Sequence, residues 1–159
     1  MTSDRITEAL SGLAALAAEY DEVFADLVES LGANAADCER DPAQLLPYME
    51  EFAADVSAVD DMTGDDMTDD ERVFLTNQFV AYLAKFLIVR HGASWDVIVD
   101  DAVPTGFRHV LRLTDVDGAS QWADPFRLAI YEFQHLPIEV TRLLAAAQMA
   151  AGIFTANAD

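Results

Sequence analysis

Cations are scarce in this chain. Nine Lys and Arg side chains stand against 29 Asp and Glu side chains, which gives a formal net charge of −20 at pH 7. Residues 1–72 hold 20 acids and three bases, a balance of −17, whereas residues 73–159 hold nine acids and six bases, a balance of −3. A surface of this sign repels phosphate groups. We therefore expect no direct binding to nucleic acid or to anionic membranes through the N-terminal half.

Cysteine and long apolar runs are also scarce. Cys38 is the single cysteine, which excludes a disulfide or a thiolate metal cluster within the chain. No uninterrupted apolar run approaches the ~18 residues that span a bilayer. The first ten residues carry an acid, Asp4, where a secretory signal would carry bases. These features predict a cytoplasmic protein that does not bind membranes.

The chain does contain enough apolar material for a folded core. Hydrophobic residues make up 52% of its 159 residues, which predicts one globular domain over residues 1–159. We expect an acidic helical half over residues 1–91, a sheet with C-terminal helices over residues 92–153, and a short tail over residues 154–159. The predicted fold class is α+β.

Three helices are predicted in the N-terminal half. Apolar residues at steps of three and four predict one long helix over residues 3–31, with Ser3 as its N-cap and Gly32 at its end. Its apolar stripe comprises Ile6, Leu10, Leu13, Ala17, Tyr20, Phe24, Leu27 and Leu31. A stripe of this width is typical of a helix packed inside a bundle. Self-association through residues 3–31, as a coiled coil, is the alternative.

The next two helices are predicted from their start signals. Asp41-Pro42 resembles an N-cap with its first residue, and Pro47 predicts a turn followed by a helix over about residues 47–59. The inward face of that helix should carry Tyr48, Met49, Phe52, Val56 and Val59. Thr68-Asp69-Asp70-Glu71 is a capping box, which predicts a third helix that runs to about His91 and ends at Gly92.

The periodicity then changes from helical to alternating. Residues 95–101 and 107–114 each alternate apolar and polar side chains, which predicts an antiparallel hairpin. A short third strand is predicted at Gln121–Trp122. Two ion pairs should form across the hairpin, because the bases of one strand share a face with the acids of the other. The residues concerned are Arg108, Arg112, Asp96 and Asp100.

Two helices are predicted to follow the sheet. Asp124-Pro125 is typical of an N-cap with Pro at the first helical position, and apolar residues at helical spacing follow it. Leu136-Pro137 interrupts this pattern. A last helix is predicted from Ile138 to about Ala151.

The segment from Phe79 to Phe133 resembles small uncharacterised bacterial domains. In these domains a helix ending in Tyr-Leu, then Gly and Trp, leads into two strands, Asp-Pro-Phe and another helix. The matching residues are Tyr82, Leu83, Gly92, Trp95, Asp124, Pro125 and Phe126. The resemblance covers about a third of the chain, and it implies an interaction or immunity-type role.

Familiar catalytic and metal-binding motifs are missing. The chain has no Walker loop, dinucleotide fingerprint, Gly-x-Ser-x-Gly or His-Glu-x-x-His. The acidic stretch over residues 58–74 and the turn at residues 115–118 both lack the ligand spacing of an EF-hand. Glu132 and His135 form one Glu-x-x-His, whereas a di-iron bundle needs two. We therefore predict no metal, no cofactor and no catalytic residue, and we favour a non-enzymatic role.

The leading hypothesis is an acidic protein, of inhibitor or immunity type, that binds a basic protein partner. One form of it is polyanion mimicry, in which the acids block a nucleic-acid-binding protein. The candidate partner-binding residues are Asp60, Asp61, Asp65, Asp66, Asp69 and Asp70. The alternative is a small-ligand binder or an enzyme with a cleft near the hairpin, where Arg108, His109 and Arg112 are the candidates.

Overall fold

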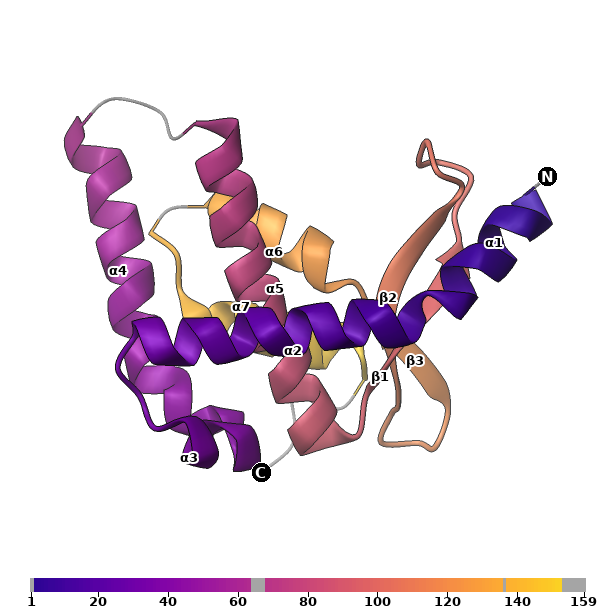
Figure 1. Ribbon diagram of the computed structural model, residues 1–159, viewed down its shortest axis with the longest axis horizontal. Helices are drawn as coiled ribbons and strands as arrows, with labels where there is room; N and C mark the ends of the chain where they lie inside the picture. Colours follow the sequence, from indigo (N-terminus) through magenta and orange to yellow (C-terminus); the bar gives the residue numbers. More distant parts are fainter. Residues whose placement is uncertain (1, 64–67, 136, 153–159) are drawn as a thin grey trace.

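The computed structural model describes the backbone of residues 2–63, 68–135 and 137–152, and the side chains of residues 4–57, 68–135 and 137–152. The described residues combine helices with one three-stranded antiparallel sheet, so the α+β prediction is confirmed. The helices are α1 (Thr2–Ser11), α2 (Leu13–Ser30), α3 (Ala35–Arg40), the 3₁₀ helix η1 (Pro42–Leu45), α4 (Leu46–Thr63), α5 (Asp69–His91), α6 (Pro125–Phe133) and α7 (Val140–Ala150). The strands are β1 (Ser94–Val99), β2 (Phe107–Thr114) and β3 (Ser120–Ala123). Figure 1 shows α2 crossing the bundle, with the sheet at one end beside α1.

The N-terminal segment is bent, so the prediction of one helix over residues 3–31 is wrong. The helix divides at Gly12, which is the N-cap of α2. Backbone hydrogen bonds continue through the bend, because the Gly12 N–H donates to Glu8 O (3.1 Å) and Gly12 O accepts from the Leu16 N–H (3.0 Å). Ser11 and Gly12 are weak helix formers. The apolar residues keep their helical spacing on both sides of Gly12, so their pattern does not show that the helix axis changes direction there. The bend lets α1 run beside β1.

The short α3 was not predicted, and three N-terminal helices are not confirmed. Asn34 caps α3 by accepting from the Asp37 N–H (2.9 Å), but six residues are too few to show helical periodicity. Asp41 does cap a helical turn, the 3₁₀ helix η1. The helix after it begins at Leu46, so Pro47 stands in its first turn. On α4, Met49 and Val56 are buried as predicted, Phe52 is half-buried, and Val59 lies outside the described side chains.

Tyr48 is a further correction, because its side chain is 40% exposed. Successive side chains of an α-helix point about 100° apart, so Tyr48 lies to one side of the face that carries Met49 and Val56. The inward face of α4 is therefore narrower than predicted.

Both predicted ends of the central helix α5 are confirmed. Thr68 Oγ1 accepts from the Glu71 N–H (3.2 Å) and Glu71 Oε2 accepts from the Thr68 N–H (3.3 Å), which completes the capping box. Gly92 ends the helix in the left-handed conformation, with φ of 71°. By length and composition α5 could also cross a membrane, but a buried core helix meets the same criteria, and the residues from Phe79 to Leu87 are largely buried here.

Phe79 is at the centre of the aromatic core. Its ring stacks on Phe52 of α4 with 5.6 Å between centroids, and it meets the edge of Phe133 of α6 at 5.4 Å. Tyr82, one turn further along α5, is also completely buried. These contacts join α4, α5 and α6, which are far apart in the sequence.

The sheet has the predicted hairpin and third strand. Trp95 pairs with Leu111 and Val97 with His109 in β1–β2, and β3 pairs with Leu111–Thr114 of β2. Both predicted ion pairs are confirmed: Arg112 Nε lies 2.5 Å from Asp96 Oδ2, and Arg108 Nε lies 2.7 Å from Asp100 Oδ2. The predicted C-terminal helices are also present, as α6 and α7.

We expect Phe79→Ala to lower the free energy of unfolding by about 3–5 kcal/mol, because it leaves a cavity between three helices. The matched control is Phe74→Ala on the same helix, whose side chain is 63% exposed and which should change stability by less than about 0.5 kcal/mol. Urea unfolding followed by circular dichroism measures both. Equal losses from the two variants would contradict the central place of Phe79.

Candidate functional site

Most cations of the described residues are engaged in internal ion pairs. Seven of the nine Lys and Arg side chains lie within 4.0 Å of a carboxylate, namely Arg40, Lys85, Arg90, Arg108, Arg112, Arg127 and Arg142. Many carboxylates on the helices are exposed and have no ion pair to a described residue, among them Glu19, Glu22, Asp26, Glu29, Glu50, Glu51, Asp69 and Asp70. The negative charge is therefore left uncompensated on the outer surface of the helices.

A groove lies between the first half of α5 and α6, with a volume of about 440 Å³. It is lined by Asp69, Arg72, Val73, Thr76 and Asn77 from α5 and by Ile130 from α6. The α5 residues recur at helical spacing, so they share one face of the helix. Val73 is 60% exposed and Ile130 is 50% exposed. We call this surface the α5–α6 groove.

The N-caps of the two helices position the groove. The capping box fixes the start of α5, which places Asp69, Asp70 and Glu71 in its first turn. At the start of α6, Asp124 Oδ1 accepts from the N–H groups of Phe126 (3.0 Å) and Arg127 (3.1 Å). The other oxygen of Asp124 lies 2.6 Å from Arg108 Nη1, which ties α6 to the sheet.

Two of the six predicted partner-binding residues are described. Asp69 lines the α5–α6 groove, and Asp70 is exposed beside it. Asp60, Asp61, Asp65 and Asp66 lie outside the described side chains.

Sequence reasoning missed the apolar part of this surface. Val73-Phe74 stands just before the stripe formed by Leu75 and Phe79, and Ile130-Tyr131 lies within the helix after Asp124. Val73 and Ile130 line the groove, and their sequence neighbours Phe74 and Tyr131, which do not line it, are also at least half exposed. The signal in the sequence was a pair of large apolar residues next to an inward stripe. That signal does not reveal that α5 and α6 lie side by side.

Arg108 belongs to a compact cluster of four charges. It lies 2.7 Å from Asp100 and 2.6 Å from Asp124, while Arg127 lies 3.6 Å and 3.9 Å from the same two carboxylates. The guanidinium also lies over the ring of Trp122, 4.9 Å from its centroid. The hydrogen bond from the Ala102 N–H is the largest cause that lowers the pKa of Asp100; burial opposes it, and the guanidinium groups of Arg108 and Arg127 lower this pKa further. The charges of the two arginines and the two aspartates cancel. Because these residues come from the hairpin and from the start of α6, the cluster joins the two elements.

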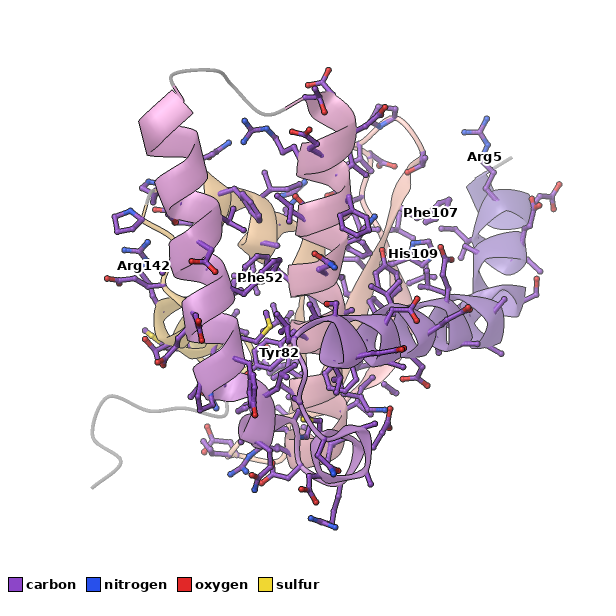
Figure 2. All side chains as sticks on the ribbon, turned by 60° about the vertical axis from the view of Figure 1, so that its left-hand side comes forward. Arg5, Phe52, Tyr82, Phe107, His109 and Arg142 are labelled. Atoms are coloured by element: carbon purple, nitrogen blue, oxygen red, sulfur yellow. The ribbon has the colours of Figure 1, made fainter. Side chains whose placement is uncertain are left out.

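Arg112 and His109 lie apart from each other. Arg112 also contacts Ser120 Oγ at 3.3 Å. Partial burial raises the pKa of Asp96, but the hydrogen bonds from Arg112 and the Val97 N–H and the charge of Arg112 together hold this pKa below its ordinary value. His109 points to the other face of β2, beside Phe107 and toward α1, as Figure 2 shows. Partial burial lowers the pKa of His109, against the opposing charge of Asp124. Arg108 and His109 share a cavity of about 280 Å³ that Arg112 does not line.

The structure brings together no three His, Cys, Asp or Glu side chains in a metal-binding group among the described residues. Glu132 is buried and bound by Arg142, whereas His135 is exposed and its Nδ1 lies 2.9 Å from Tyr131 O. Cys38 is buried, and burial together with the nearby charges of Asp37 and Glu39 raises its pKa. A thiol in this environment is a poor nucleophile.

No family model, curated protein or solved structure was found to match the chain. The resemblance of residues 79–133 to small bacterial domains therefore stays a prediction. In the structure, its matching residues Tyr82 and Leu83 are buried, while Gly92 and Asp124 cap helices.

Replacing Asp124 tests how α6 is held. Asp124→Ala removes the N-cap of α6 and one of the two carboxylates beside Arg108, so we expect the free energy of unfolding to fall by about 3 kcal/mol. Asp124→Asn keeps an oxygen for the N–H groups and should lose clearly less. Urea unfolding measures the difference, and equal losses would contradict a contribution from the cap.

Proposed function

We propose that this protein is a non-catalytic binding protein that takes a basic segment of a partner protein into the α5–α6 groove. The proposal rests on one observation, namely that Val73 and Ile130 stay exposed in a groove whose rim carries uncompensated carboxylates. Large apolar side chains gathered in a concave surface are typical of interaction sites. The groove combines the exposed apolar side chains of Val73 and Ile130 with an edge where Asp69 and Asp70 outnumber the one base, Arg72.

Charge complementarity favours a basic occupant. The first turn of α5 carries three carboxylates, and Arg72 on the same helix removes one unit of that charge. The N-terminus of the helix dipole contributes roughly half a positive charge. The first turn therefore stays negative, and the remaining acids of the chain add to the same potential. Such a field accelerates association with a cationic partner and disfavours anionic ones.

The shape of the groove favours a helical segment. Two neighbouring helices leave a channel that accepts the apolar face of a third helix, with anchors at helical spacing. Val73 and Ile130 would contact those anchors, while Asp69 and Asp70 would face Lys or Arg side chains on the flank of the segment. The expected occupant is thus a basic amphipathic helix.

Self-association through residues 3–31 is a different proposal and uses a different surface. Phe24 and Leu27 of the predicted stripe are completely buried in the core of the described structure. A partner helix could reach them only by displacing that core. We therefore favour the α5–α6 groove as the binding surface.

A synthetic amphipathic peptide made of Leu and Lys tests the proposal directly. We expect it to bind at low ionic strength, to shift the NMR signals of Val73, Thr76 and Ile130, and to bind more weakly as salt increases. Val73→Ser with Ile130→Ser should weaken binding about tenfold, because the apolar anchors lose their contacts. A peptide of the same composition with its apolar residues scrambled should bind the unchanged protein no more tightly than the amphipathic peptide binds this double variant.

Matched variants separate the groove from the general acidity of the protein. Asp69→Asn with Asp70→Asn should weaken binding more than Glu22→Gln with Asp26→Asn, which removes the same charge from α2. Met149→Ser is the control for the Val73→Ser with Ile130→Ser variant, because it removes an exposed apolar side chain from α7, outside the groove. Equal losses from the two charge pairs would contradict the groove and favour diffuse polyanion mimicry instead.

A further inference from the structure

A second cavity, of about 580 Å³, lies where the bend between α1 and α2 faces the start of β2. Its volume is within the range of small-molecule sites, roughly 300–1,000 Å³. The apolar lining comes from Ala9, Gly12, Ala15, Leu16 and Phe107. The polar lining comes from Arg5, Glu8, Glu19, Thr105 and His109. Figure 2 shows Arg5, Phe107 and His109 around this space.

The cavity is open because the helix residues that face it are small. Ala9, Gly12 and Ala15 stand at consecutive turns around the bend. A Cβ added at Gly12 would meet only backbone oxygens of Glu8 and Ala9, each at 3.6 Å, which is ordinary contact. Steric crowding of the bend therefore does not explain the small residues. They leave room over Phe107 and His109.

Most polar side chains that line this cavity have no partner among the described residues. The side chains of Arg5, Glu8, Glu19 and His109 make no hydrogen bond or ion pair to a described residue. Thr105 is different, because its hydroxyl donates to Phe107 O (2.9 Å). The ring of His109 meets Phe107 edge-on, with 5.5 Å between centroids. Neither ring nitrogen of His109 has a hydrogen bond to a described residue, so both can bond a ligand.

The charges favour a cation. Glu8 and Glu19 outnumber Arg5, so the polar lining is negative, and the whole chain adds its net charge of −20. His109 stays largely neutral near pH 7, because burial lowers its pKa. A neutral imidazole accepts a hydrogen bond from an ammonium group, and the face of Phe107 attracts a cation.

We propose that this cavity binds a small organic amine, with its apolar body on Phe107 and Leu16 and its protonated amine between Glu8, Glu19 and His109. An anionic ligand would meet two carboxylates for one guanidinium. A wholly apolar ligand would leave the carboxylates and the imidazole without partners. The site is separate from the α5–α6 groove, so the two proposals stand or fall independently.

Titration of the full chain with three indole compounds tests the proposal by NMR. Tryptamine carries the amine, indole is neutral and indole-3-acetate is anionic. We expect tryptamine to shift the signals of Gly12, Thr105 and His109 in a saturable manner, with a dissociation constant in the roughly millimolar range or tighter. Indole should bind at least about tenfold more weakly, and indole-3-acetate more weakly still.

Paired variants locate the site. Ala15→Leu should abolish binding by filling the cavity, whereas Ala14→Leu, an equal change at an exposed neighbour that does not line it, should leave binding unchanged. Glu8→Gln with Glu19→Gln should weaken tryptamine about tenfold, while Glu22→Gln with Glu29→Gln should change it less than about twofold. Unchanged amide spectra elsewhere show that each variant is folded.

Several results would overturn the proposal. They are no saturable binding of tryptamine, equal binding of indole-3-acetate, or indifference to Ala15→Leu. Shifts confined to α5 and α6 would assign the amine to the α5–α6 groove and would also overturn this site.

Discussion

The packing of apolar side chains around α5 is the interaction on which the other features depend. Phe79 contacts rings from α4 and α6, and Tyr82, Leu83 and Leu87 are completely buried on the same helix. A chain with a net charge of −20 repels itself, and its many surface acids contribute little attraction. Burial of apolar surface must therefore supply the stability. Because α5 is held on several sides, its exposed first turns project as a fixed surface rather than a frayed end.

The few cations of the chain complement that core by adding ion pairs between its elements. Arg108 links the hairpin to the start of α6, Lys85 links α5 to Glu39 of α3, and Arg90 links the end of α5 to Asp41. Exposed pairs of this kind contribute little each, but Arg108 is mostly shielded from water, so breaking its pairs leaves a charge in a poorly solvated place. Engaging the cations internally also leaves the outer acids unmatched. The excess of acids itself comes from the composition, because nine bases cannot neutralise 29 acids wherever they are placed.

Local signals in the sequence were sufficient to predict helix ends and the facing of strand residues, because neighbouring residues determine both. The capping box at Thr68–Glu71, the left-handed Gly92 and the Asp124 cap each depend on neighbouring residues, and alternation alone gave the facing of Arg108 and Arg112. The bend at Gly12 was missed because it serves contact between α1 and the sheet, which is long-range. The α5–α6 groove was missed for the same reason, since Ile130 and Val73 become neighbours only when the helices pack. Asp69 was found by its charge, without its apolar neighbours.

The two faces of β2 explain how one strand can carry both a structural role and the binding role that we propose. Side chains alternate along a strand, so Arg108 turns to the balanced cluster with Asp124 while His109 turns to the side of α1. In the first position a charge is fully matched by its surroundings, and nothing is left for a ligand. In the second, the imidazole of His109 bonds no described residue and lines the cavity with small residues and the carboxylates of Glu8 and Glu19, although it also borders the smaller cavity beside Arg108 and Asp124. Residue type alone would make Arg108 a better candidate than His109 for binding a ligand. Arg108 is already paired with Asp100 and Asp124, so His109 becomes the better candidate.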